Sequence, residues 1–364
     1  MVVRAAVKAE SAGALTLRRG LLVVAAAALI TGVLAGLARL GIFIGWGPRH
    51  LVDHGPLLVL GAFATIIALE RAVALGRTYG LVAPGLGAVA AVAMLTGARW
   101  APWAAVVAAA LMVVLNVMIV RRQVAAFTLL MLLGAAPLLV GNIMWTLGRP
   151  VFAVVPAWLG FFVITIVAER LELSRLAPTP RWAHVGVVVV ATLLASSTCA
   201  HAVGLVTWPR VTGAWLILLG SWQLAFDLAR HTVRRVGLPR FAAVGVLGGA
   251  AWLVVAGVLL GVYGLPAAGP HYDAALHAVF VGFVFAMVFA HAPIILPAVA
   301  RVQVRFTRWL YLPLVVLHGG LVGRIVGDLF ELAPLRRAGA VASAAALGLF
   351  VVVVLGARWA RRPG

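Results

Sequence analysis

A succession of long apolar runs, which occupies almost the whole chain, constrains the fold more than any other feature. One helical crossing of a bilayer needs about 20 apolar residues. Runs of this kind, bounded by Arg, Pro or Gly, lie at 21–45, 52–75, 80–97, 101–120, 124–146, 151–170, 184–205, 211–229, 241–264, 274–299, 309–328 and 338–357. The pattern predicts an all-α, polytopic membrane helix bundle of about twelve transmembrane helices. Because the run at 80–97 is short and rich in glycine, eleven helices remain an alternative.

The composition excludes a string of soluble domains. Hydrophobic residues make up 64% of the chain and charged residues 10%, and the mean hydropathy is +1.13. We therefore expect a single transmembrane domain at 21–357, between a cytoplasmic segment at 1–20 and a cytoplasmic tail at 358–364. The first run is too long for the apolar core of a signal peptide. The single cysteine, Cys199, lies within an apolar run, so a disulfide framework and a C-x-x-C site are excluded.

The basic residues predict the orientation of the bundle. The chain has 29 Lys and Arg against 9 Asp and Glu. With twelve helices, 21 of the basic residues fall on the side of the termini and 6 on the other side. Since basic residues concentrate on the cytoplasmic side, we expect both termini in the cytoplasm. The Arg residues stand singly or in small groups between apolar runs, so we expect the lipid bilayer and no nucleic acid as a partner.

Histidines inside the predicted helices form two levels. His54 and His277 lie near the periplasmic surface, where His201 can join them, whereas His291 and His318 lie deeper on consecutive antiparallel helices. His277 and His291 are 14 residues apart, which in an α-helix places them on nearly the same face. A polar group within the hydrocarbon layer marks a candidate functional site.

Imidazole is a common ligand of haem iron and of copper. We therefore take His54, His277, His291 and His318 as candidate metal ligands, with haem as the expected cofactor and copper as a second candidate. The alternative is that each imidazole only hydrogen-bonds a carbonyl group or a neighbouring helix.

Several charged residues also lie within or at the ends of the runs. Arg324 stands four residues before Asp328 and can pair with it, or it can bind a haem propionate as part of the cofactor site. Glu70, Glu169, Glu172 and Arg175 cluster at the predicted cytoplasmic ends of two helices. A salt-bridge network is the favoured interpretation of this cluster, and proton entry or a quinone site is the alternative.

Three stretches carry a resemblance to a known family. They are HGPLLVLG from His54, LHAVFVGFVFAMVFAHAPIILP from Leu276, and YLPL from Tyr311 with His318-Gly319. Together they resemble the NnrS family, twelve-helix bacterial membrane proteins of the nitric oxide response that contain haem and copper. The resemblance implies an inner-membrane protein whose ligand is nitric oxide or another small diatomic molecule.

A weaker similarity reaches the catalytic subunit of the haem-copper oxidases. In that family a His-Gly pair in the second helix and a His in the tenth ligate a low-spin haem, which implies His54 and His277 as the haem pair. The runs at 151–170 and 184–205 lack the copper histidines of the family, since His201 and the interfacial His184 are the only ones available. A full oxygen-reducing centre is therefore not expected.

Three functions are compatible with these sequence features. The first is haem binding in nitric oxide tolerance, by binding the gas, protecting metal centres or passing electrons. The second is secondary transport through a bundle with buried ionisable groups. The third is an enzyme related to the haem-copper nitric oxide and oxygen reductases.

Overall fold

The computed structural model describes residues 12–175, 177, 179–205 and 209–357. These residues form helices and connecting turns, without a strand among them. Eleven of the helices in this described part are long and apolar enough to cross a membrane. The prediction of an all-α polytopic membrane bundle is therefore confirmed.

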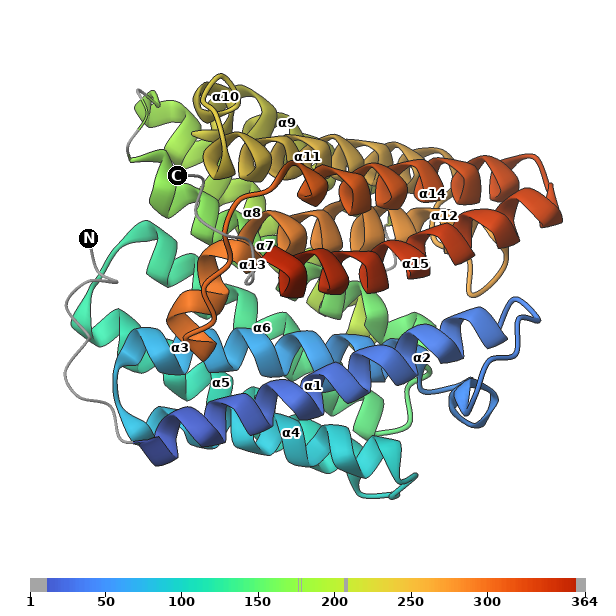
Figure 1. Cartoon of the computed structure of the whole chain (residues 1–364), viewed down its shortest axis with the longest axis horizontal. Coiled ribbons are helices and arrows are strands. Elements are labelled where there is room, and N and C mark those ends of the chain that lie inside the picture. The colour runs from blue at the N-terminus through green and yellow to red at the C-terminus, as the bar shows by residue number, and fades with distance from the viewer. Residues whose placement is uncertain (1–11, 176, 178, 206–208, 358–364) are drawn as a thin grey trace.

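The helices lie nearly parallel and antiparallel to one another (Figure 1). In chain order, the membrane-length elements are α1 (Ala12–Ala38), α2 (His54–Pro56) continued by η3 (Leu57–Ala64) and α3 (Thr65–Leu75), α4 (Val82–Leu95), α5 (Ala101–Arg122), α6 (Ala126–Thr146), α7 (Val151–Ser174), α8 (Arg181–Val203), α9 (Pro209–Phe226), α11 (Leu238–Tyr263), α12 (Pro270–His277) continued by η5 (Ala278–Phe285) and α13 (Ala286–Ala300), α14 (Tyr311–Leu329) and α15 (Ala333–Ala357). Short elements connect some of them: η2 (Gly47–His50), η4 (Thr78–Leu81), α10 (Ala229–Thr232) and η6 (Arg308–Leu310).

The doubt over the helix count falls on α9 rather than on the short run at 80–97. That run forms α4, preceded by the turn η4, and belongs to a membrane-length segment. In contrast, α9 packs along α11 but contains Arg210 and Gln223 in only 18 residues, and it is not among the eleven apolar segments. Helix α1 begins and α15 ends at the same end of the bundle (Figure 1), as an even number of crossings requires.

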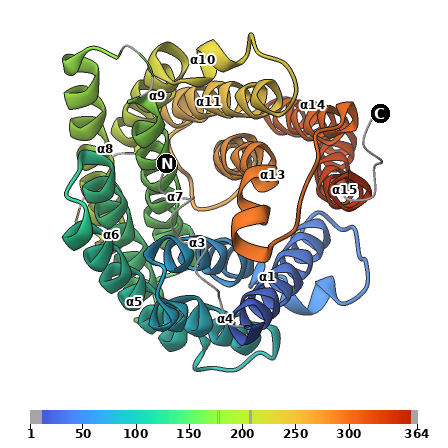
Figure 2. The same ribbon diagram turned by 60° about the vertical axis from the view of Figure 1, so that its left-hand side comes forward.

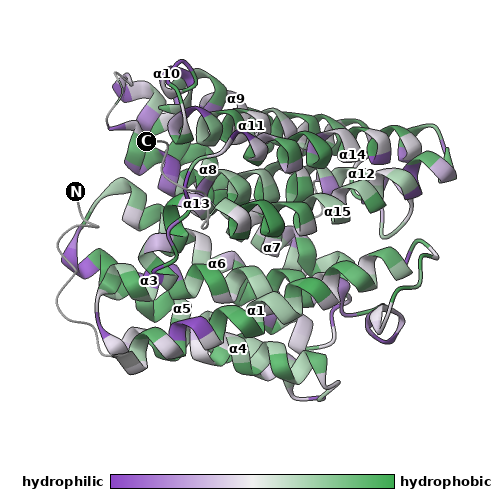
Figure 3. Ribbon diagram, viewed as in Figure 1, coloured by the Kyte–Doolittle hydropathy of each residue, from purple (hydrophilic) through white to green (hydrophobic). Residues whose placement is uncertain are grey.

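Two helices occupy the interior of the bundle. Figure 2 shows α13 surrounded by other helices. Helix α7 is the most enclosed of the eleven candidate spans, since 89% of the residues in its most apolar stretch are buried. Its large side chains Trp158, Phe161 and Phe162 have almost no exposed surface. Apolar residues cover most of the ribbon in Figure 3, while the most hydrophilic residues gather mainly at the helix ends. The polar residues inside the bundle therefore stand out as candidates for function.

Two of the helices that carry histidines contain a long π-helical segment. η3 and η5 are each eight residues long; η3 begins three residues after His54, and η5 begins directly after His277. A π-helix has roughly 4.4 residues per turn, so η5 rotates the chain by roughly 140° less than eight α-helical residues do. For this reason the expectation that His277 and His291 share a face, which assumed regular α-helix, is not met.

A candidate site built on two histidines

His54 and His277, the pair expected at the outer level, lie side by side. Their ring centroids are 6.4 Å apart and their planes are inclined by 18°. His54 is the first residue of α2 and His277 the last of α12, so the site joins segments 223 positions apart in the sequence. Figure 1 places α2 and α12 toward the end of the bundle opposite the start of α1. Both imidazoles keep some exposed surface, and that of the His277 side chain is 18%.

Hydrogen bonds identify which nitrogen of each ring carries the proton. Nδ1 of His54 lies 2.7 Å from the carbonyl oxygen of Gly32, and Nδ1 of His277 lies 2.8 Å from that of Asp273. Because a carbonyl oxygen only accepts, each Nδ1 donates and each Nε2 keeps its lone pair. Within the described residues no hydrogen bond reaches either Nε2. A backbone carbonyl on one ring nitrogen and a free lone pair on the other are typical of metal-ligating histidines.

Helix α1 closes the site from one side, which the sequence patterns did not reveal. A β-carbon on Gly36 would lie 2.5 Å from Cε1 of His54 and 2.7 Å from its Nδ1. Gly32, one turn earlier, supplies the carbonyl that binds the same ring. The spacing Gly32-x-x-x-Gly36 is the sequence signal that could have indicated this close approach, because small residues at this interval let helices pack closely.

Arg324 pairs with Asp273 rather than with Asp328. Its Nε and Nη2 donate to the two carboxylate oxygens of Asp273 at 2.7 and 2.9 Å, and Asp328 instead lies 3.6 Å from Nη1 of Arg336. The expected pairing within α14 is therefore wrong, because a residue on the neighbouring α12 offers a better bidentate geometry. Oδ1 of Asp273 also lies 3.3 Å from Nδ1 of His277. Arg324 thus contacts the histidine pair through Asp273.

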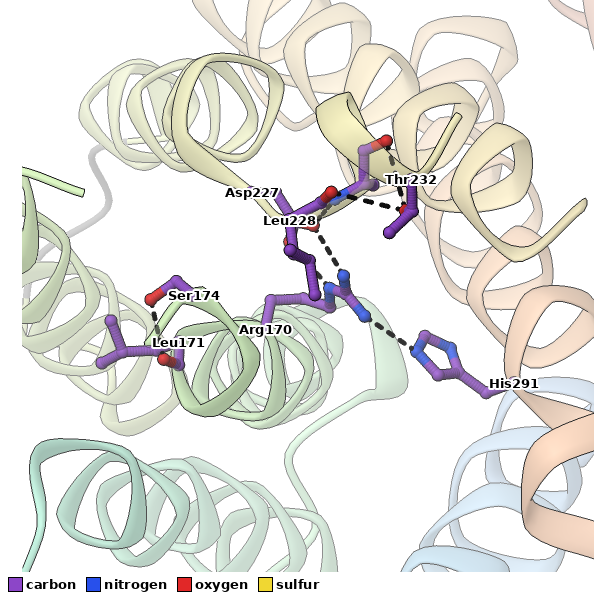
Figure 4. Close-up of polar contacts among 8 residues, drawn as sticks. Arg170, Leu171, Ser174, Asp227, Leu228, Thr232 and His291 are labelled. Carbon is purple, nitrogen blue, oxygen red and sulfur yellow. Dashed lines mark hydrogen bonds and ion pairs between the residues drawn. The ribbon is translucent and has the colours of Figure 1, made fainter. Parts of the chain in front are cut away.

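The deeper histidines have separate partners. Nδ1 of His291 donates to the carbonyl of Met287 at 2.7 Å, and its Nε2 lies 3.3 Å from Nη1 of Arg170. Arg170 also donates to both carboxylate oxygens of the fully buried Asp227, at 2.6 and 2.7 Å (Figure 4). This network joins α7, the junction of α9 with α10, and α13.

His318 belongs to a different contact, on the face of α14 toward α11. Nε1 of Trp252 donates to its Nδ1 at 2.8 Å. Since an indole nitrogen only donates, Nδ1 of His318 is an acceptor and its Nε2 carries the proton. Metal binding through this Nε2 therefore requires the bond to Trp252 to break. No hydrogen bond or ring contact joins His318 to His291 in the described part of the chain.

The carboxylate cluster at the other end of the bundle is a salt-bridge network. Arg71 hydrogen-bonds Glu169 across α3 and α7 and lies 3.7 Å from Glu70. Arg175, which we grouped with these residues, instead lies over the ring of Phe127 at 4.4 Å. Arg71 and Asp227 are the partners that the sequence analysis missed.

His201, the remaining outer histidine, lines a small cavity with Pro209 and Leu276, and within the described part of the chain no ring contact joins it to the pair. Among the described residues, no group of three or more His, Cys, Asp and Glu side chains is arranged to hold a metal ion. The site with the strongest ligand geometry is therefore the two-histidine pair.

Comparison with known families assigns the chain to one of them. The model of the family described as "Domain of unknown function (DUF8744)" matches residues 18–359. The match covers nearly the whole chain, so the protein belongs to this family. No curated protein matches the sequence.

Proposed function

We propose that this member of the DUF8744 family is a haem-binding protein of the bacterial inner membrane, with His54 and His277 as the two axial ligands of one haem. The observation that carries the proposal is the distance of 6.4 Å between the two ring centroids. An iron–imidazole bond of roughly 2 Å, with the nitrogen roughly 1 Å from its ring centre, places two axial imidazoles roughly 6 Å apart.

The hydrogen bonds support the same assignment. Both Nε2 atoms have the lone pair that iron needs, and both Nδ1 atoms are held by backbone carbonyls that fix the rings. Arg324 uses Nε and Nη2 on Asp273, so Nη1 is the group of this residue that can bind a haem propionate. We restrict the proposal to haem, because His291 and His318 accept hydrogen bonds from Arg170 and Trp252 with the nitrogens that would otherwise ligate copper.

This ligand set favours electron transfer among the activities considered. His54 and His277 would together hold both sides of a haem iron and so leave no position for a gas. When bound, a haem would supply one-electron chemistry, which suits a role in the nitric oxide response that the NnrS resemblance implies. Here His54 and His277 hold and orient the cofactor, and Asp273 and Arg324 fix the orientation of His277.

For the orientation in the membrane we propose cytoplasmic termini and a periplasmic histidine pair. The surplus of basic residues on the side of the termini supports this assignment. The start of α1 and the end of α15 lie at one end of the bundle, which agrees with both termini being on the same side of the membrane.

The test is an absorption spectrum of the full-length protein, purified in detergent after expression with added haem. We expect a Soret band and the sharp bands of a reduced low-spin haem. His54→Ala and His277→Ala should each lose the haem or change its spin state. His271→Ala, on the same helix α12 but stacked on Tyr263 at 4.1 Å, is the matched control and should keep the wild-type spectrum. A protein without a Soret band would favour secondary transport instead.

A further inference from the structure

Two connections at one end of the bundle carry exposed arginine residues. The first runs from α9 through α10 to the start of α11, and the second runs from α13 through η6 to α14. Figure 1 places α10 at the end of the bundle where α1 begins. The arginines are Arg234, Arg235 and Arg240 in the first connection and Arg308 in the second, and we call them the arginine platform. Asp273 is the only acidic residue between positions 228 and 327, and it lies on α12, so neither connection has a carboxylate of its own.

Aromatic contacts hold the two connections together. The rings of Phe241 and Tyr311 meet edge to face, with their centroids 5.4 Å apart. A β-carbon on Gly237 would lie 3.9 Å from Cδ1 of Phe306, so the backbone of the first connection also approaches the second. Phe241 directly follows one platform arginine, and Tyr311 comes three residues after another. The structure therefore brings arginines from two separate parts of the chain to one surface.

The protein itself does not neutralise the platform. All four of its side chains are exposed. Within the described residues none of them belongs to an ion pair, because the arginines paired there are Arg71, Arg170, Arg324 and Arg336. A guanidinium group has five N–H donors in a planar fork that matches the oxygens of a phosphate. The platform thus offers several such donors to an anion.

The start of α11 adds to the positive charge. A helix N-terminus carries a partial positive charge, which acidic residues in the first turn commonly offset. The first turn of α11 has no acidic residue and contains Arg240 instead. Gly237, the residue before this helix, makes no side-chain hydrogen bond to its first N–H groups. An anion beside Arg240 would therefore be stabilised by the helix as well as by the guanidinium group.

Apolar side chains beside the platform indicate which anion fits. Trp309 directly follows Arg308 and is 68% exposed, and Val236 directly follows Arg235 and is 84% exposed. Tryptophan is enriched at the headgroup level of a bilayer. A free phosphate ion would leave both side chains in water, whereas a phospholipid presents an acyl chain next to its phosphate. Apolar and basic groups together therefore favour a lipid.

We propose that the arginine platform binds the phosphate headgroup of an anionic phospholipid, in the leaflet at the end of the bundle where α1 begins. Clusters of basic residues next to membrane helices are typical of sites for anionic lipids. The site is separate from the histidine pair and does not depend on haem binding.

Native mass spectrometry of the full-length protein in detergent can test the site. Phosphatidylglycerol and phosphatidylcholine are added separately at equal concentrations, and the fraction of protein with bound lipid gives each affinity. We expect the wild type to bind phosphatidylglycerol at least tenfold more tightly than phosphatidylcholine. Arg235→Gln combined with Arg308→Gln removes one charge from each connection. Because each basic residue near an anionic surface contributes roughly fivefold to affinity, the double variant should bind phosphatidylglycerol about 30-fold more weakly.

A matched variant separates a defined site from the general positive charge of this side of the protein. Arg77→Gln combined with Arg121→Gln also removes two exposed arginines, which lie next to α3 and at the end of α5 instead. This variant should keep the wild-type affinity. Equal losses in the two double variants, or equal binding of the two lipids by the wild type, would overturn the proposal. Displacement of phosphatidylglycerol by an equal concentration of inorganic phosphate would also overturn it. The readout involves no haem, so its failure leaves the proposed function standing, and the converse also holds.

Discussion

Arg324 and Asp273 form a bidentate ion pair between α14 and α12, and the carboxylate of this pair lies 3.3 Å from Nδ1 of His277. His54 has no such partner among the described residues, where its Nδ1 binds the carbonyl of Gly32 alone. The two proposed haem ligands are therefore unequal. A carboxylate near Nδ1 makes an imidazole a stronger electron donor, which stabilises the oxidised iron.

The first prediction follows from this asymmetry. Asp273→Asn removes the negative charge but keeps the backbone carbonyl that orients His277, so haem should stay bound. The reduction potential should rise by about 60 mV, which corresponds to a tenfold change in the equilibrium constant for one electron. A spectroelectrochemical titration measures the change. Asp53→Asn serves as the control, because Asp53 contacts His50 instead; an equal shift in both variants would contradict the argument.

The second prediction concerns the ring planes. Two axial imidazoles inclined by 18° are nearly parallel, and nearly parallel planes give ferric low-spin haem a rhombic electron paramagnetic resonance spectrum. Perpendicular planes give a single strongly shifted feature instead. A frozen sample of the oxidised protein therefore reports the angle directly. The strongly shifted signal would show that the rings rotate when haem binds, or that other residues are the ligands.

The third prediction tests the close approach of α1. Gly36→Ala places a methyl group against the ring of His54, so the imidazole must move and haem affinity should fall by tenfold or more, as measured by haem titration of the apoprotein. Gly20→Ala is the matched control on the same helix, since a β-carbon there meets no atom within 4 Å. Both changes add the same helix propensity, about 1 kcal/mol. Equal haem affinity in the two variants would argue against a role for Gly36.

The fourth prediction concerns the buried ion pair of Arg170 with Asp227. Removing one member of a buried pair leaves an uncompensated charge and costs about 3 to 5 kcal/mol. Asp227→Ala should therefore lower the unfolding temperature measured in detergent, and Arg170→Met combined with Asp227→Leu should recover most of the loss. Val185→Ala, at an exposed position on α8, should have little effect. A stable Asp227→Ala protein would mean that water reaches Arg170.

The fifth prediction concerns topology. A fluorescent protein that matures only in the cytoplasm should be bright when fused to the C-terminus, and alkaline phosphatase at the same place should be inactive. A phosphatase inserted in the connection between α11 and α12 should be active, because this connection lies on the predicted periplasmic side. The reverse pattern at both positions would place the histidine pair on the cytoplasmic side.

The helices were predictable from the sequence because a bilayer imposes a minimum apolar length on each of them. The observed starts and ends of α5, α6 and α7 lie within four residues of the predicted ones. The depth of a residue along its helix was predictable for the same reason. His54 and His277 were therefore expected at the same level of the bundle. The rotation of residues about the helix axis was not predictable, because the composition of Ala278–Phe285 does not indicate a π-helix.

Partners between helices were the least predictable part of the site. Arg324 has an acidic residue one turn away on its own helix, and only the packing of α12 against α14 shows that Asp273 is the better acceptor. The contact of Trp252 with His318 is of the same kind, since it depends on the relative rotation of α11 and α14. Sequence spacing describes one helix at a time, whereas these contacts depend on two.

The position of the histidine pair has a consequence for energy conversion. The pair is held by α2 and α12, which lie toward the end of the bundle opposite the start of α1. Moving one charge across the full membrane potential changes its energy by about 2.3 kcal/mol per 100 mV. An electron exchanged with a donor or acceptor on the nearer side crosses only a small part of this potential. With a single haem at this place, electron exchange would move almost no charge across the membrane. Its rate would therefore hardly depend on the membrane potential.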